Sequence, residues 1–118
     1  MRRVLCFLLA GLWTALWAGE ILKEGRLAQG KKWETPFYQR ASNLPGPTVV
    51  ITGGLHGNEP AGARAAEQIR HWPITRGRLI VIPRANLPGL GDGTRFLLGE
   101  PPQRRDLNRQ FPKTKAPN

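Results

Sequence analysis

Histidine and cysteine are scarce in this sequence, and their scarcity limits the chemistry it can support. The 118 residues include two histidines and one cysteine. That cysteine, Cys6, lies in an apolar run near the amino terminus, so a chain that loses this run has no thiol. A disulfide within the chain is therefore excluded, and catalysis by a cysteine nucleophile is not expected.

Acidic residues are also few, and the chain is strongly basic. The sequence has 8 Asp and Glu residues and 18 Lys and Arg residues, which gives a net charge of +10, or about +8 without Arg2 and Arg3. Such a field attracts polyanions, cell-envelope polymers or anionic small substrates, but it says nothing about the fold. We expect no specific binding of nucleic acid.

The apolar run is too short for a membrane span. It covers residues 4–18, follows Arg2 and Arg3, and ends at Gly19 and Glu20. Because a span needs about 20 apolar residues, the pattern predicts a cleaved signal peptide over residues 1–18 and no permanent span. We therefore expect an exported protein, periplasmic or secreted. Leu16 is large for its place in a cleavage site, so an uncleaved anchor stays the alternative.

The middle of the chain predicts a βαβ unit. Residues 48–52, TVVIT, predict a strand buried on both faces, and residues 79–82, LIVI, predict a second buried strand. Between them, residues 61–72 predict a helix, with Ala65, Ile69 and Trp72 on one stripe and Pro73 at its end. A connection of this length favours parallel strands and an α/β fold.

The flanking segments give weaker signals. Residues 19–47 are polar with an aromatic group, and we expect a lead-in segment that forms a strand or an initial hairpin. Beyond Ala85 the chain is rich in Gly, Pro and charge, which predicts a long loop over the functional site. About 100 residues after the leader is near the lower limit for an α/β enzyme, so we expect a domain that is incomplete at its C-terminus.

The first candidate site follows the first strand of this unit. His56 and Glu59 lie three residues apart, after a glycine pair and before Pro60. Imidazole nitrogen and carboxylate oxygen suit Zn²⁺, and catalytic zinc is held by sets such as two His and one Glu. The pattern is common by chance, but its place between a strand and a helix favours a metal site. His71, eleven helical residues or roughly 16 Å away, is not expected to be the third ligand.

A second group of polar residues follows about fifty residues later, in residues 106–112, DLNRQFP. Arg109 offers a planar fork for a carboxylate, and Asn108 is a neutral donor beside it. Asp106 could be carried back to the first site by the loop. Taken alone, this stretch is more typical of a solvated basic loop.

Together, the two stretches resemble a known family. Residues 53–60, GGLHGNEP, and 106–112, DLNRQFP, closely resemble two motifs of the succinylglutamate desuccinylase and aspartoacylase family, which is related to the zinc carboxypeptidases. Residues 83–86, PRAN, and 94–96, TRF, resemble its intervening segment. The resemblance covers roughly residues 48–112 and implies a partial three-layer α/β/α domain.

The resemblance also implies a role for each matching residue. His56 and Glu59 would bind zinc, Arg95 would polarise the scissile carbonyl, and Asn108 with Arg109 would hold the substrate carboxylate. Arg105 is a possible substitute for Arg95. The resemblance gives Asp106 no ligand role. The implied reaction is hydrolysis of an N-acyl amino acid or terminal peptide amide by water that the zinc activates.

The family also has a second histidine ligand and a glutamate base further along its chain, and this sequence has no match for either. We therefore expect residues 48–118 to be the amino-terminal part of a zinc hydrolase domain, truncated and of doubtful activity alone. The alternative is a small basic exported protein that binds anionic polymers electrostatically, without catalysis. The acyl group and the oligomeric state are not predicted.

Overall fold

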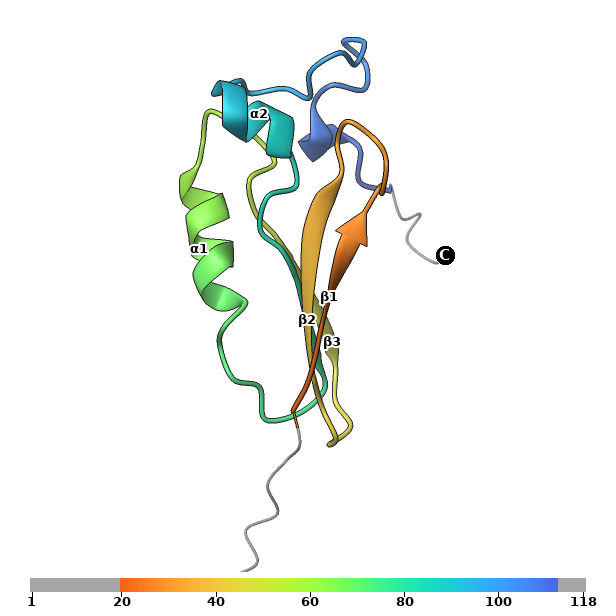
Figure 1. The fold of residues 1–118 in the computed structure, drawn as a ribbon, viewed down its shortest axis with the longest axis vertical. Helices are drawn as coiled ribbons and strands as arrows, with labels where there is room; N and C mark the ends of the chain where they lie inside the picture. Colours follow the sequence, from red (N-terminus) through yellow and green to blue (C-terminus); the bar gives the residue numbers. More distant parts are fainter. Residues whose placement is uncertain (1–19, 113–118) are drawn as a thin grey trace, which may run out of the picture.

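The computed structural model describes residues 20–112, which form a single four-stranded sheet beside a helix (Figure 1). The strand order is β1-β2-β4-β3, in which β3 and β4 are parallel and the other neighbours antiparallel. The bounds of the strands are β1 Glu20–Leu27, β2 Thr35–Ser42, β3 Thr48–Thr52 and β4 Arg78–Ile82.

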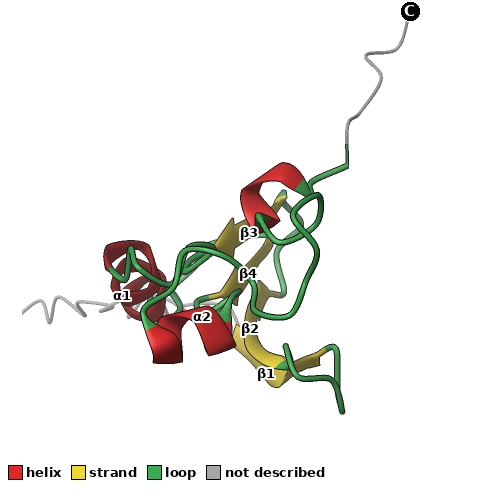
Figure 2. Ribbon diagram, turned by 90° about the horizontal axis from the view of Figure 1, so that it is seen from above, coloured by secondary structure: helices red, strands yellow, loops and turns green. Residues whose placement is uncertain are grey.

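The predicted βαβ unit is confirmed. Helix α1, Ala61–Ile69, connects the parallel strands β3 and β4 and packs against both. Figure 2 shows it on one side of the sheet. The α/β fold class is therefore correct, and the second helical layer of the expected three-layer arrangement is not found among residues 20–112.

Helix α1 is held close to the sheet by small residues. Its buried side chains are Ala63 and Ala66. Gly53 lies below the helix, where an added Cβ would stand 2.5 Å from the carbonyl oxygen of Gly62. Ala66 joins Leu79 and Val81 in the core, so the core depends on this short distance between helix and sheet.

The helical stripe predicted from the sequence is correct only for Ile69, which packs against the core. Ala65 is exposed, and Trp72 is 60% exposed and lies beyond the end of α1 at Ile69. Alanine is favourable on either face of a helix, so its periodicity does not identify the face that packs. The close approach at Gly53 selects Ala63 and Ala66.

Strand β3 is less buried than its sequence predicts. Val49 and Val50 are 47% and 57% exposed, although consecutive strand residues point to opposite faces. The prediction of a strand buried on both faces is therefore contradicted for the described residues. The physical reason is position: β3 is at the edge of the sheet and pairs only with β4 there.

One flanking segment forms the initial hairpin that the sequence analysis expected as one of two possibilities, and the other has more structure than the sequence predicts. The lead-in segment forms the β1–β2 hairpin, and β2 joins the sheet by pairing with β4. The predicted long loop after Ala85 contains two short helices, α2 over Leu87–Asp92 and the 3₁₀ helix η1 over Leu107–Arg109. Both lie near the carboxyl ends of β3 and β4 (Figure 1).

The structure gives no test of the predicted leader, because residues 1–18 lie outside the described residues. Within residues 20–112, no helix is long and apolar enough to cross a membrane.

Candidate metal and substrate site

The candidate site lies where β3 and β4 end. The chain after β3 turns at Gly54, whose positive φ of 64° suits glycine. The segment after β4 then binds this turn, since the backbone N–H groups of Ala85 and Asn86 donate to the carbonyl oxygens of Gly53 and Gly54, both at 2.9 Å. The loop that carries His56 and Glu59 is therefore attached to both parallel strands.

His56 and Glu59 face each other, as the metal-site prediction requires. Nδ1 of His56 lies 3.4 Å from Oε2 of Glu59. Two ligand atoms each about 2.1 Å from one tetrahedral ion lie about 3.4 Å apart. His56 is 8% exposed, whereas the Glu59 side chain is 58% exposed. The pair thus has the separation and the open side that a shared zinc ion needs.

The other ring nitrogen of His56 contacts Asp106. Nε2 lies 3.0 Å from Oδ1 of Asp106, which also accepts a hydrogen bond from the backbone N–H of Asn108 at the start of η1. Glu59 and Asp106 therefore lie at different ring nitrogens of His56. An ion bound by Nδ1 and Glu59 could not also be bound by Asp106 through that nitrogen. The loop therefore does carry Asp106 back to the first site, where it contacts His56 although the resemblance gives it no ligand role.

Both carboxylates are stabilised in their ionised form. The hydrogen bond with His56 is the main cause that lowers the pKa of Glu59 below its usual range, and Arg95 adds to the effect. The pKa of Asp106 is also lowered, again chiefly by its hydrogen bond with His56. Both groups are therefore negatively charged at neutral pH and suited to a cation or an imidazole N–H.

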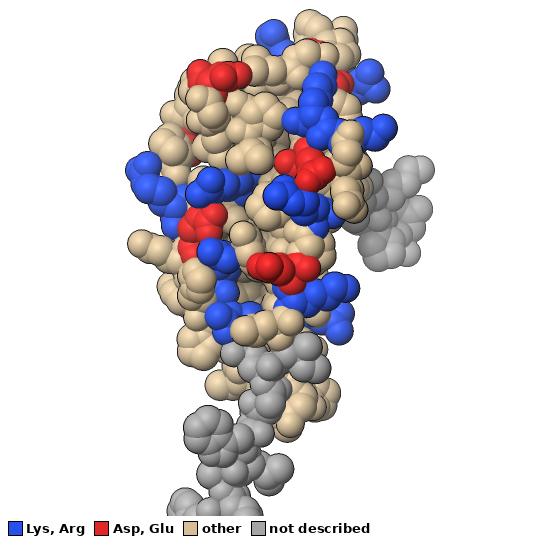
Figure 3. Space-filling view, viewed as in Figure 1, with Lys and Arg blue, Asp and Glu red and all other residues tan. Residues whose placement is uncertain are grey.

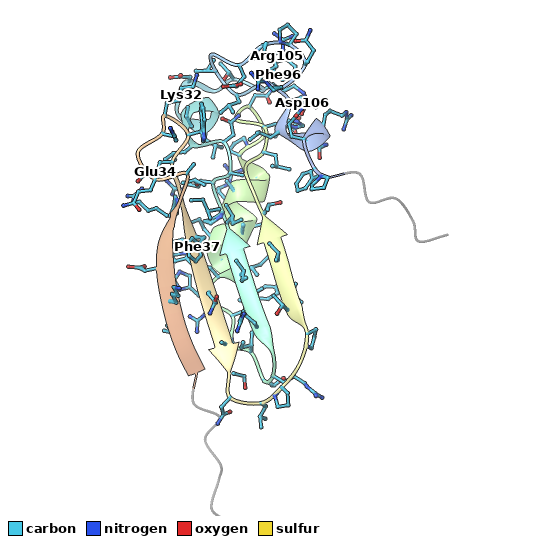
Figure 4. The ribbon with its side chains drawn as sticks, turned by 90° about the vertical axis from the view of Figure 1, so that its right-hand side faces the viewer. Lys32, Glu34, Phe37, Phe96, Arg105 and Asp106 are labelled. Carbon is cyan, nitrogen blue, oxygen red and sulfur yellow. The ribbon has the colours of Figure 1, made fainter. Side chains whose placement is uncertain are left out.

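Arg95, rather than Arg105, reaches the candidate site. An amino group of Arg95 lies 2.5 Å from Oε1 of Glu59. Arg105 instead stacks on Phe96, with its guanidinium carbon 4.3 Å from the ring centre. Figure 4 shows Phe96 and Arg105 together in the loop beyond the sheet. The geometry therefore favours Arg95 over its substitute.

Asn108 and Arg109 differ in their relation to the site. A cavity of about 550 Å³ is lined by His56, Glu59, Arg95 and Asn108 together with the backbone around Gly53. Arg109 is not among the lining residues, and its guanidinium lies 3.4 Å from the carbonyl oxygen of Asn108. The structure thus brings four of the five predicted residues together around one cavity and leaves Arg109 beside it.

His71 lies elsewhere, as expected. It lines a separate cavity with Tyr38, Arg40 and Arg70. Among residues 20–112, no group of three His, Cys, Asp or Glu side chains is arranged to hold one metal ion. The described residues therefore offer His56 and Glu59 as a pair of candidate ligands and no third member.

Comparisons with known proteins agree with this arrangement. Residues 45–117 match the succinylglutamate desuccinylase/aspartoacylase catalytic domain. Over 70 residues, the chain is 36% identical to the N-alpha-acetyl-L-2,4-diaminobutyric acid deacetylase of Halomonas elongata, covering 57% of this chain and 20% of that protein.

Solved structures show the same likeness. A succinylglutamate desuccinylase/aspartoacylase from Rhodobacter sphaeroides is 30% identical with a TM-score of 0.59, covering 82% of this chain and 31% of the other. An aspartoacylase family protein from Mesorhizobium loti is 28% identical with a TM-score of 0.62, covering 82% and 32%. The chain spans less than a third of the length of each.

The matched region includes both sequence motifs and every residue around the candidate cavity. This chain therefore belongs to the succinylglutamate desuccinylase/aspartoacylase catalytic domain family.

Proposed function

We propose that this chain carries part of the active site of a zinc-dependent amidohydrolase that cleaves an N-acyl amino acid or a terminal peptide amide. The observation that supports it most strongly is the convergence of His56 and Glu59, with 3.4 Å between Nδ1 and Oε2. The families of the relatives and the deacetylase activity named for one of them support the reaction class.

His56 and Glu59 are the proposed metal ligands. In the metal-bound site, Nε2–H would donate to Asp106, and Nδ1 would turn its lone pair to the metal on the side of Glu59. A bound zinc ion would supply Lewis acidity, which polarises a carbonyl group and makes water a stronger acid. Asp106 would fix the ring orientation and tautomer, as acidic partners of metal-binding histidines do.

Arg95 is the proposed group for the substrate carbonyl. Its side chain is 41% exposed, and its guanidinium contacts Glu59. A cation bound by Glu59 would weaken this ion pair, because Arg95 and the metal then compete for the same carboxylate. The freed guanidinium could donate to a carbonyl oxygen as negative charge develops there.

Asn108 and Arg109 are the proposed contacts for the carboxylate end of the substrate. Asn108 lines the cavity, and Arg109 follows it in η1. A guanidinium can bind a carboxylate through two parallel hydrogen bonds. Since Arg109 lies outside the cavity lining, we expect its side chain to turn inward when an acidic substrate binds.

The alternative of electrostatic polymer binding would be favoured by a surface of one charge sign, and the face seen in Figure 3 does not show one. On the face seen in Figure 3, the Lys and Arg side chains are interspersed with Asp and Glu. Several of these form ion pairs, such as Arg70 and Arg84 with Glu67. Export to the periplasm or medium stays part of the proposal and depends on the leader predicted over residues 1–18.

Zinc titration of the purified chain tests the metal site. We expect weak binding with about one equivalent, because the described residues supply two ligands. His56→Ala and Glu59→Gln should remove it, whereas His71→Ala, a matched histidine in another cavity, should leave it unchanged. Equal binding by wild type and His56→Ala would refute the site.

Hydrolysis is tested separately with N-acyl amino acids. We expect slow or undetectable turnover, since a third protein ligand and a general base are not found around the cavity in the described residues. Tight binding of zinc together with rapid hydrolysis would show that this chain is catalytically sufficient, contrary to the expectation of a partial site.

A further inference from the structure

The buried side chain of Asn86 has no assigned role, yet it contacts the loop that carries His56. Asn86 is 0% exposed. Its Nδ2 donates to the carbonyl oxygen of Leu55, the residue before His56, at 3.3 Å. Its Oδ1 accepts from the backbone N–H of Gly89 at 3.0 Å. A fully buried amide keeps its place only when both ends are paired, as they are here.

The residue after His56 is fixed by the same unit. Gly57 packs on Gly89, so closely that a Cβ added to Gly57 would lie 2.0 Å from the carbonyl carbon and oxygen of Gly89. Gly89 in turn packs on Asn86, since a Cβ added there would lie 2.4 Å from Nδ2. The chain before and after the histidine therefore rests on Asn86 and the first turn of α2.

The backbone of Asn86 reinforces these contacts. Its N–H donates to the carbonyl oxygen of Gly54, and its carbonyl oxygen accepts from the N–H of Leu90, both at 2.9 Å. The residue thus joins the end of β4, the start of α2 and the loop after β3. No other described side chain is both polar and completely inaccessible to solvent.

We propose that Asn86 is a positioning residue for the metal site. By holding Leu55 directly and Gly57 through Gly89, it sets the backbone from which the ring of His56 presents Nδ1 to Glu59 and Nε2 to Asp106. The expected effect of Asn86 on zinc binding rests on the proposed function. The positioning of His56 by Asn86 is a property of the metal-free chain. Asn86 touches neither the metal nor the substrate in this role.

The first experiment compares Asn86→Ala with a matched control. Thr35→Val also removes a part-buried hydrogen bond near the end of β4, from the Thr35 hydroxyl to the carbonyl oxygen of Arg84 at 2.6 Å, but Thr35 makes no side-chain hydrogen bond to the His56 loop in the described structure. Asn86→Ala should weaken zinc binding by about 10-fold or more, as loss of supporting contacts does in metal sites. Thr35→Val should lower stability and leave zinc affinity unchanged.

A metal-free measurement separates this inference from the proposed function. Imidazole ¹⁵N shifts report the surroundings of the two ring nitrogens of His56, and amide exchange reports the order of His56 and Gly57. Asn86→Ala should change the ring shifts and speed exchange at both amides, and Thr35→Val should change neither. If His56→Ala retains zinc binding, the metal site fails, while these two readings still decide the role of Asn86.

Two further measurements test the proposal if the Asn86→Ala variant does not fold. Asn86→Asp keeps the acceptor for the Gly89 N–H and loses the donor to Leu55, so it should show an intermediate loss of zinc affinity. In wild type, the side-chain N–H protons of Asn86 should exchange slowly. Rapid exchange there, or a folded Asn86→Ala variant with wild-type ring shifts and zinc affinity, would overturn the proposal.

Discussion

His56 and Asp106 are fifty residues apart in the chain, and their side chains meet at 3.0 Å between Nε2 and Oδ1. The contact joins the loop after β3 to the start of η1. Figure 4 shows Asp106 at η1, beyond the carboxyl ends of the strands. It leaves Nδ1 as the nitrogen that faces Glu59.

Replacing Asp106 should weaken the metal site without removing a ligand. We expect Asp106→Ala to lower zinc affinity about 10- to 100-fold, because the ring loses the group that fixes its tautomer. Asp106→Asn keeps an acceptor oxygen and should lose less. Zinc competition with a coloured chelator measures both, and Asp92→Asn in α2 is the control. Wild-type affinity in Asp106→Ala would show that the contact has no effect on the histidine.

Removing Arg95 should not weaken zinc binding, in contrast to the replacement of Asp106. Its guanidinium competes with a metal for Glu59, so Arg95→Ala should leave zinc affinity unchanged or raise it by up to about fivefold, the range of an exposed ion pair. Arg105→Ala removes an arginine that stacks on Phe96 and should have no effect. A tenfold loss of zinc affinity in Arg95→Ala would show instead that the arginine holds Glu59 in place.

Two glycines offer a test of the packing. In Gly53→Ala the new methyl group meets the carbonyl oxygen of Gly62 and the side chain of Ala66, so the free energy of unfolding should fall by about 1–3 kcal/mol. Gly91, in α2, has open space at its Cβ position, so Gly91→Ala should be neutral or stabilising by up to about 1 kcal/mol. Urea denaturation compares the two, and equal stabilities would contradict the close packing of α1 on Gly53.

Acid should destabilise the metal-free chain through Asp106. Its pKa is lower in the folded chain than in the unfolded chain, so the unfolded state takes up protons first as the pH falls. The stabilisation is therefore complete above about pH 5 and is lost as the pH falls through the folded pKa. Thermal melting at several pH values should show this decline, and Asp106→Asn should make it shallower. The same slope in both proteins would assign the decline to other carboxylates.

The local parts of the fold were predictable from the sequence. The strand over residues 48–52 and the position of His56 and Glu59 depend on β-branched residues, glycines and short spacing, all of which act over a few residues. The β1–β2 hairpin was less clear because its alternation is weak. Whether β3 is buried depends on its position in the sheet, and the sequence of a single strand does not predict that position.

The sequence predicted which residues form the candidate site better than it predicted which of them contact one another. Motif resemblance named Arg95 and Asn108, and the structure brings both to the cavity with His56 and Glu59. The partner of the second ring nitrogen could not be read from spacing, because it depends on how the loop of residues 93–105 returns to the sheet. A carboxylate two residues before the Asn-Arg pair was the available signal for Asp106.

The exposed valines of β3 bear on how residues 20–112 would behave in solution by themselves. Within residues 20–112, one edge of β3 has no strand beside it, and Val49 and Val50 are open to solvent on opposite faces. An uncovered apolar strand edge is a template for adding a strand from another molecule, a route to aggregation. Purification of this chain at high concentration should therefore favour self-association, and Val50→Lys should suppress it.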